Sequence, residues 1–224
     1  GARLAADAAT YDVKDDGALY RAIEYQGTSL QNLTMLERIT LTNMAIEMGG
    51  KNAVVPCDDK TEKWLMEKLP SNGWERVLPD AGAEYVETFE YDVSNLEPQV
   101  ACPSLPSNVK DVSAVAGTKV DQVFIGSCTN AYYDDLVRAA NILRGRKISA
   151  DIRCLVMPAT NAIYKQAMRD GVLQVFADAG CLVNPSGCGP CFGGHMGLLA
   201  EAEVCFSTTN RNYPGRIGSP KSFV

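Results

Sequence analysis

Apolar residues in the second half of the chain fall into short blocks whose spacing alternates between that of strands and that of helices. Blocks rich in Val, Ile, Leu and Phe are bounded by Gly, Pro and polar residues, as in buried strands. The segments between them have the apolar spacing of helices. The predicted strands are 120–125, 152–157, 181–183 and 204–207, and the predicted helices are 132–143, 161–170 and 172–179. This alternation predicts an α/β fold with a mostly parallel sheet.

The first half of the chain is less regular, but it carries clear boundary signals. Thr34 is followed three residues later by Glu37, a capping-box pattern that predicts a helix over 35–48, and a Gly-Gly pair ends it. A second helix is predicted over 59–69, where a proline follows. The predicted strands of this half are 18–26, 52–56 and 84–91.

A stretch rich in Pro, Ser and Asn, residues 92–118, separates the two patterns. Such a composition is typical of an irregular connection between folded parts. We therefore expect a polar, Ala-rich lead-in at 1–16, a first α/β lobe at 17–105 and a second lobe, which carries the candidate site, at 106–224.

Composition narrows the classes of function. The chain has 224 residues, of which 46% are hydrophobic and 21% charged, as in ordinary globular proteins. It contains no apolar run long enough to span a membrane, and its first residues lack the apolar core of a secretion signal. We therefore expect a cytoplasmic protein without a membrane partner. The net charge of −6, without any basic cluster, argues against a nucleic-acid partner but leaves room for a small anionic substrate.

Three of the eight cysteines stand in glycine-containing turns that follow predicted strands. Cys128 lies in Gly126-Ser-Cys-Thr-Asn130, and two more form Cys188-Gly-Pro-Cys191. Ligands bind at the carboxyl ends of parallel strands, where these turns are expected. A structural zinc ion or a standard iron–sulfur cluster takes four protein ligands. Three thiolates therefore suggest a cluster with one open metal position, which Lewis-acid catalysis requires.

Alternative interpretations of these cysteines stay open at this point. A Cys-x-x-Cys pair also occurs in thioredoxin-like redox proteins, although there it usually opens a helix and here glycines interrupt the segment. The only histidine, His195, lies beside this loop and is either a donor near the cluster or a solvated loop residue. Buried free thiols are expected in the apolar runs around Cys154, Cys181 and Cys205, and loop thiols at Cys57 and Cys102.

Two further pairs of residues are candidates for binding a substrate. Arg211 and Arg216 lie five apart in a loop with Pro and Gly after the last predicted strand, where two guanidinium groups can converge on a carboxylate. Asn43 and Glu47 lie at i and i+4 of a predicted helix and so share a face. The alternatives are solvated arginines and an exposed polar stripe.

With these residues assembled, the sequence resembles the aconitase superfamily, in particular the large subunits of 3-isopropylmalate dehydratase and homoaconitase. The matching segments, in family order, are Glu24-Tyr-Gln-Gly27, Asn43-Met-Ala-Ile-Glu47, Ile125-Gly-Ser-Cys-Thr-Asn130, Gly187-Cys-Gly-Pro-Cys191 and Ser207-Thr-Thr-Asn-Arg-Asn-Tyr-Pro-Gly-Arg216. The resemblance covers most of residues 17–224. It implies aconitase-like three-layer α/β/α lobes.

The resemblance also implies a cofactor and a set of roles. It implies a [4Fe–4S] cluster held by Cys128, Cys188 and Cys191. Asn43 and Glu47 would contact iron-bound water and substrate, and Asn210 would donate beside the cluster. Arg211 and Arg216 would bind substrate carboxylates.

The implied reaction is dehydration and rehydration of a hydroxy di- or tricarboxylic acid, of the 3-isopropylmalate dehydratase type that serves leucine biosynthesis. Homoaconitase, an aconitase-type hydratase and a truncated, non-catalytic iron–sulfur module are the alternatives. Family members also carry an N-terminal domain with catalytic His and Asp, for which nothing before residue 17 is a counterpart. Their catalytic serine belongs to a swivelling domain or small subunit. We therefore expect a small-subunit or swivelling-domain partner, and a chain that is inactive without these parts.

Overall fold

Four short strands of the second half build the central sheet of the structure, a computed structural model that describes residues 17–69 and 73–224. The strands are β5 (Gln122–Ile125), β6 (Arg153–Val156), β7 (Leu182–Val183) and β8 (Cys205–Ser207). They are parallel and lie in the order β7-β6-β5-β8, with Gln122 opposite both Arg153 and Cys205. The predicted parallel α/β arrangement is confirmed.

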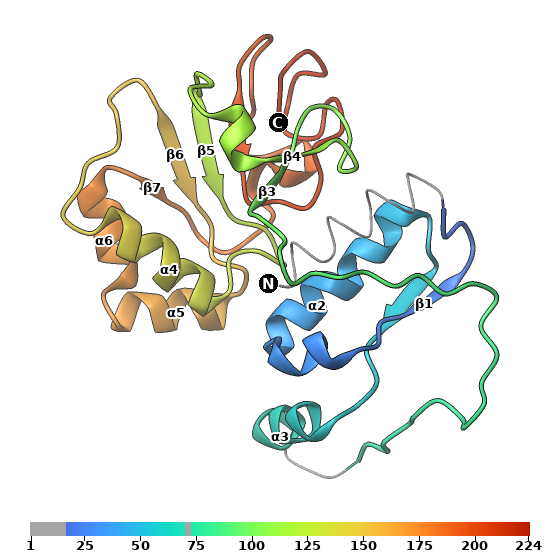
Figure 1. Cartoon of the computed structure of the whole chain (residues 1–224). Helices are drawn as coiled ribbons and strands as arrows, with labels where there is room; N and C mark the ends of the chain where they lie inside the picture. Colours follow the sequence, from blue (N-terminus) through green and yellow to red (C-terminus); the bar gives the residue numbers. More distant parts are fainter. Residues whose placement is uncertain (1–16, 70–72) are drawn as a thin grey trace. The chain divides into compact units, whose positions relative to one another are not determined.

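The two faces of this sheet are covered differently. Helices α4 (Tyr133–Leu143), α5 (Asn161–Arg169) and α6 (Val172–Ala179) gather on one face, where Leu136, Val156 and Phe176 are fully buried (Figure 1). The other face buries Phe124, Met157 and Ile217 beneath the loops that follow β7 and β8. In residues 99–224, therefore, the layer opposite the helices consists of loops and the short 3-10 helix η4 (Gly189–Phe192).

The chain divides into two compact units, residues 1–98 and 99–224. The division comes before the expected boundary at 105/106. Strand β3 (Gln99–Ala101) pairs antiparallel with β4 (Val109–Asp111), so this hairpin spans the expected boundary and belongs to the second unit. The 3-10 helix η3 (Val112–Val115) follows it. The lead-in expected at 1–16 lies outside the described residues.

The first unit contains two parallel strands, β1 (Ala22–Glu24) and β2 (Asn52–Val54), and the helical segments between and after them. These are the 3-10 helix η1 (Thr28–Asn32), α2 (Met35–Asn43), the 3-10 helix η2 (Met44–Met48) and α3 (Asp59–Lys68). The predicted capping box is present: the Glu37 backbone N–H donates to Thr34 Oγ1 at 3.2 Å, and the Thr34 N–H donates to Glu37 Oε2 at 2.8 Å. Gly49 ends the helical segment with φ of 76°, as predicted for this glycine pair.

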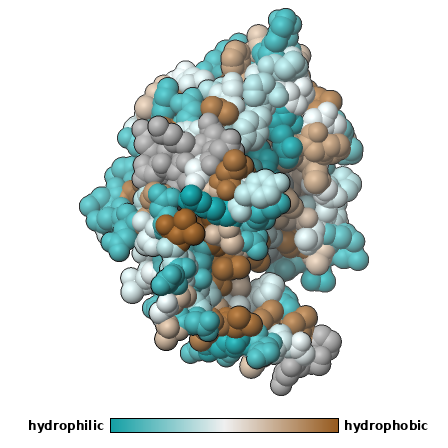
Figure 2. Space-filling model, turned by 90° about the vertical axis from the view of Figure 1, so that its right-hand side faces the viewer, coloured by the Kyte–Doolittle hydropathy of each residue, from teal (hydrophilic) through white to brown (hydrophobic). Residues whose placement is uncertain are grey.

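The predicted strand over 84–91 is wrong. These residues form no β-ladder in the described part of the chain, and Tyr85, Val86 and Phe89 are exposed. Instead, they contact β1 through side chains: Tyr85 Oη donates to Glu24 Oε2 at 3.0 Å. An alternating pattern makes a strand only where a neighbouring strand and a core face receive it. In the view of Figure 2, brown apolar surface is scattered among teal polar surface.

No helix in the described residues combines the length and the apolar character that crossing a membrane requires.

Candidate functional site

The turn that carries Cys128 begins directly after β5. Ser127 has a positive φ of 90°, which is uncommon for a residue other than glycine, and its side chain is buried. The next residue, Cys128, is exposed. Thr208, after β8, pins this turn: the Gly126 N–H donates to Thr208 Oγ1 and that hydroxyl donates to the Gly126 carbonyl, each at 3.0 Å. The turn is thus held in a strained shape that presents the Cys128 thiol outward.

The second turn carries Cys188 and Cys191 and follows β7. It winds into η4, where the Cys191 N–H donates to the Cys188 carbonyl at 3.1 Å. Cys188 is exposed, whereas Cys191 is 8% exposed and packs into the core under the sheet. The Cys-x-x-Cys pair therefore opens a single short 3-10 turn rather than a long helix, which does not favour the thioredoxin-like interpretation.

Phe124 brings the two cysteine turns together. A Cβ added at Gly126 would lie 2.2 Å from the Phe124 ring, and one at Gly189 would lie 3.3 Å from the same ring carbon and 2.1 Å from the sulfur of Met157. Both backbones therefore approach one buried ring closely, and Gly189 also has a positive φ of 55°. One buried side chain therefore supports both cysteine turns.

The loop after β8 contributes Asn210 to the first turn. Asn130 Nδ2 donates to Asn210 Oδ1, and Thr208 Oγ1 also contacts the Asn130 carbonyl at 3.4 Å. Asn130 is 2% exposed, and its Oδ1 has no hydrogen-bond partner in the structure. The predicted residue Asn210 therefore lies beside the Cys128 turn.

The same loop brings Arg216 to the second turn. Arg216 Nη2 donates to Cys191 Sγ at 3.6 Å. Arg211 is half-buried, and its carbonyl accepts a hydrogen bond from Thr209 Oγ1 at 3.3 Å. Asn212, 8% exposed, anchors the loop: its Nδ2 donates to the Cys102 carbonyl at 2.8 Å and reaches the Leu105 carbonyl at 3.4 Å. The loop with both arginines is thus tied to the β3–β4 hairpin.

Asn43 and Glu47 lie in the first unit. Asn43 is the last residue of α2, and Glu47 lies in η2 and is 5% exposed. In an α-helix residues i and i+4 share a face, but a 3-10 helix turns by about 120° per residue. The change of winding after Asn43 therefore separates the two side chains around the helix axis more than the sequence suggested.

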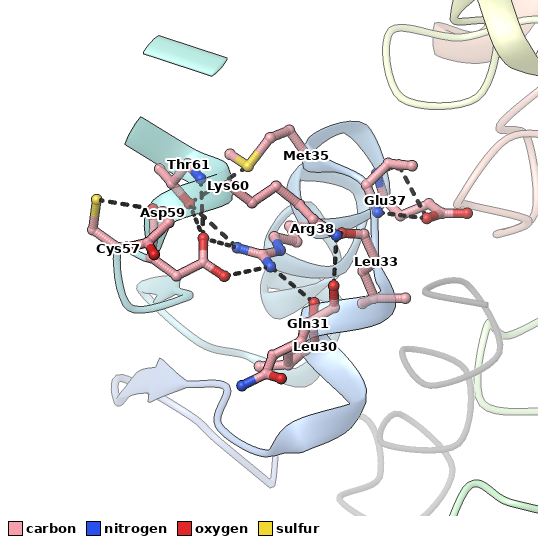
Figure 3. A network of polar contacts seen from close by, with 12 residues as sticks. Leu30, Gln31, Leu33, Met35, Glu37, Arg38, Cys57, Asp59, Lys60 and Thr61 are labelled. Atoms are coloured by element: carbon pink, nitrogen blue, oxygen red, sulfur yellow. Dashed lines mark hydrogen bonds and ion pairs between the residues drawn. The ribbon is translucent and has the colours of Figure 1, made fainter. Parts of the chain in front are cut away.

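An ion pair and several hydrogen bonds fix α2, the helix that leads to these two residues. Arg38 of α2, 3% exposed, donates to both carboxylate oxygens of Asp58 at 2.8 and 2.7 Å and to the Leu30 carbonyl at 2.9 Å. Lys60 Nζ donates to the Leu33 carbonyl at 2.8 Å. Figure 3 shows the Arg38 side chain reaching from α2 to the start of α3. Asp58 also caps α3, since its side chain accepts from the Thr61 N–H, so one carboxylate joins two helices.

The surroundings of two core thiols, Cys154 and Cys205, raise their pKa values. A hydrogen bond with Cys181 and burial raise the pKa of the Cys154 thiol, and burial raises the pKa of Cys205 to about 12. These thiols are buried in the core, as predicted for them and for Cys181. Near the first turn, burial above all, and then the charges of Cys128 and Asp135, raise the pKa of Tyr132. His195 is exposed, with a φ of 69°.

Three cysteines and several buried polar atoms without partners stand on or beside the two cysteine turns and the loop after β8. Among the described residues, no three His, Cys, Asp or Glu side chains are arranged to hold a metal ion. Thiolates are soft donors of the kind that bind iron–sulfur clusters. Ser186 Oγ, Asn130 Oδ1 and Arg216 Nε are buried without partners on or beside these loops, which leaves polar atoms for an inserted group.

The sequence interpretation did not single out four residues that support the cysteine and arginine loops: Phe124, Asn130, Thr208 and Asn212. Asn130, Thr208 and Asn212 lie inside recognised motifs, so membership of a motif was a usable signal. Phe124 acts through burial and long-range contacts, for which the sequence carries no local signal.

Fold and site together define a parallel α/β protein with cysteine and arginine loops at one end of its sheet. The family model described as "Aconitase family (aconitate hydratase)" matches residues 8–117 and 109–223. This chain belongs to the aconitase family.

Relatives within the family are closely similar in sequence. The chain is 54% identical over 209 residues to the 3-isopropylmalate dehydratase large subunit of Sulfurihydrogenibium sp. (strain YO3AOP1), covering 93% of this chain and 48% of that protein. It is 49% identical over 212 residues to the protein of that name from Aquifex aeolicus (strain VF5), covering 92% and 49%. To 3-isopropylmalate dehydratase large subunit 1 of Methanopyrus kandleri it is 48% identical over 215 residues, covering 96% and 51%. The chain thus spans about half the length of these relatives.

Proposed function

We propose that this chain is the cluster-bearing part of an iron–sulfur hydro-lyase of the 3-isopropylmalate dehydratase type. The observation that carries the proposal is the support of both cysteine turns by one buried ring, Phe124, with Arg216 donating to the sulfur of Cys191. The names of the relatives reported above indicate the substrate type, a hydroxy dicarboxylic acid with a branched apolar side chain.

The proposed ligands of the cluster are Cys128, Cys188 and Cys191. When bound, a [4Fe–4S] cluster with one open iron supplies a Lewis acid for the hydroxyl that leaves. Two of the three thiols are exposed, so the cluster would face solvent on the side where substrate arrives. The buried thiol, Cys191, would fix the cluster to the core.

The arginine loop would hold the acid. Arg211 and Arg216 carry the positive charge that substrate carboxylates need, in a chain whose net charge is −6. Asn212 restrains the loop from the hairpin side, so the guanidinium groups are held before substrate arrives, which reduces the entropic cost of binding. Asn210, fixed against Asn130, is proposed as a donor beside the cluster.

Dehydration also removes a proton from the carbon adjacent to the one that bears the hydroxyl. Glu47 and Asn43 are proposed to contact the departing water and the substrate. The base for the carbon-bound proton is assigned to the partner, a small subunit or swivelling domain. The proposed setting is the cytoplasm, where the free cysteines of the described residues stay reduced.

Anaerobic reconstitution with iron and sulfide tests the ligand assignment. We expect about four irons per chain and a broad visible absorbance. Cys188→Ser should lose both signals, whereas Cys57→Ser, which changes a half-buried thiol of the first unit, should keep them. An unchanged iron content and absorbance in Cys188→Ser would contradict the assignment of Cys188 as a cluster ligand.

The hydro-lyase assignment needs a second assay. The chain is supplied with the polypeptide region that the longer relatives carry and with a small subunit, and hydration of an isopropylmaleate-type acid is followed. Turnover that depends on Cys188 is expected. A loaded cluster without turnover in the complete assembly would instead favour a non-catalytic iron–sulfur module.

A further inference from the structure

The guanidinium of Arg216 contacts a proposed cluster ligand. Its Nη2 donates to Cys191 Sγ at 3.6 Å. Among the described residues it makes no ion pair with Asp or Glu, and its Nε is buried without a hydrogen-bond partner. Cys191, which carries the sulfur beside it, is 8% exposed. A cation is thus held against a buried sulfur atom and has no acidic partner among these residues.

The core of the second unit builds this contact. Ile217, next in sequence, is fully buried in the same apolar cluster as Cys191 and Phe124. Its carbonyl accepts from the Leu199 N–H at 2.8 Å, and the Arg216 N–H donates to the Tyr213 carbonyl at 2.9 Å. Backbone bonds on both sides of Arg216 therefore fix where its side chain begins.

The charge on the Cys191 sulfur decides how favourable its contact with Arg216 is. A neutral thiol is a weak acceptor, whereas a metal-bound thiolate is an anionic one. The half-buried Arg216 has no acidic partner among the described residues, and a thiolate beside it supplies a counter-charge. The contact is therefore most favourable when Cys191 serves as a cluster ligand. Hydrogen bonds and charge at ligand sulfur also raise the reduction potential of an iron–sulfur cluster.

We propose that Arg216 is a positioning residue for Cys191, which holds this sulfur as a ligand and sets the reduction potential of the cluster through its hydrogen bond. The inference rests on the proposed function and adds to the carboxylate-binding role. The two roles are compatible because a guanidinium has five N–H donors and Cys191 takes one of them.

The test compares reduction potentials of reconstituted variants. Arg216→Met removes the charge and the donors, Arg216→Lys keeps the charge without the planar fork, and Arg144→Met is the control at an exposed arginine after α4. Reduction of the cluster is titrated and followed by electron paramagnetic resonance, and iron loss to a chelator is timed. We expect Arg216→Met to lower the reduction equilibrium constant about tenfold, or ~59 mV for one electron. Iron loss should be faster in it, Arg216→Lys should lie between, and the control should match the unmodified chain.

Each outcome bears on the inference. A cluster in Arg216→Met with unchanged potential and unchanged iron loss would overturn it. If Arg216→Met does not hold a cluster, Arg216→Lys and Arg216→Gln are compared instead. Equal reduction potentials in these two variants and the unmodified chain would also overturn the inference. If the unmodified chain takes up no iron, the proposed function fails first, and this inference loses its premise.

Discussion

The Arg38–Asp58 pair allows one stability prediction to be worked through in detail. The two perturbations are Arg38→Met and Asp58→Asn, alone and together. Methionine keeps the length and apolar character of the arginine stem, and asparagine caps a helix as well as aspartate does. The double-mutant cycle therefore isolates the charge pair while it preserves the cap of α3 and the packing of α2.

The expected magnitudes follow from the unequal burial of the partners. The Arg38 side chain is 3% exposed and the Asp58 side chain is 37% exposed. Arg38→Met leaves a carboxylate that water can reach, so we expect a loss of about 2 kcal/mol. Asp58→Asn leaves a buried cation without its counter-charge, so we expect about 3–4 kcal/mol. The double variant should lose about 2 kcal/mol less than the two single losses combined.

Tryptophan fluorescence in urea measures this directly. Both tryptophans, Trp64 and Trp74, belong to the first unit, and Trp64 lies in α3. Their signal therefore reports unfolding of the unit that contains the pair. Losses that simply add in the double variant would refute the assignment of the pair as the joint between α2 and α3.

The pH dependence provides an independent check. The hydrogen bond from Arg38, chiefly, holds the pKa of Asp58 well below its usual range. The folded-state pKa is thus lower than the unfolded value of about 3.9, so the carboxylate stabilises the fold above that pH and this contribution is lost as the pH falls further. The difference in unfolding free energy between the unmodified chain and Asp58→Asn should narrow below about pH 4. A difference that stays constant from neutral to acid pH would contradict this account.

Two further predictions concern the arginine loop. A Cβ at Gly218, where φ is 130°, would lie 2.5 Å from the backbone N and 2.6 Å from the backbone O of Leu199. Gly218→Ala should therefore destabilise the chain by about 3 kcal/mol, measured as a lower melting temperature. An unchanged melting temperature would show that the backbone there can move to make room for the methyl group. Asn212→Ala removes the donor to the carbonyls of Cys102 and Leu105. We expect the free energy of unfolding, measured by heat or urea, to fall by about 2 kcal/mol. A variant as stable as the unmodified chain would show that water replaces the amide there.

Much of the second unit was predictable because its signals are local. Helix α4 was expected over 132–143 and occupies Tyr133–Leu143, and β6 was expected over 152–157 and occupies Arg153–Val156. In the first unit, the Thr34–Glu37 box formed as predicted, since it depends on four consecutive residues. Buried strands and capped helices carry their cause within a few positions of sequence, so the pattern sufficed.

Predictions that depended on a distant partner were less secure. Residues 84–91 alternate as a strand does, yet they contact β1 by side chains, because nothing local says whether a neighbouring strand accepts the ladder. The i, i+4 relation of Asn43 and Glu47 assumed one continuous α-helix, but the winding tightens after Asn43. Both differences arise from packing rather than propensity.

The sequence by itself determined the alternation of strands and helices, the family, and which residues are candidates for the chemistry: three cysteines in glycine-rich turns and two arginines in one loop. Only the tertiary structure decided how these segments support each other. Phe124 lies under both cysteine turns, Asn212 ties the arginine loop to the β3–β4 hairpin, and Arg216 points to the sulfur of Cys191. Residue types and short spacings identify a chemistry, but burial and the closing of long loops decide which of those groups can act together.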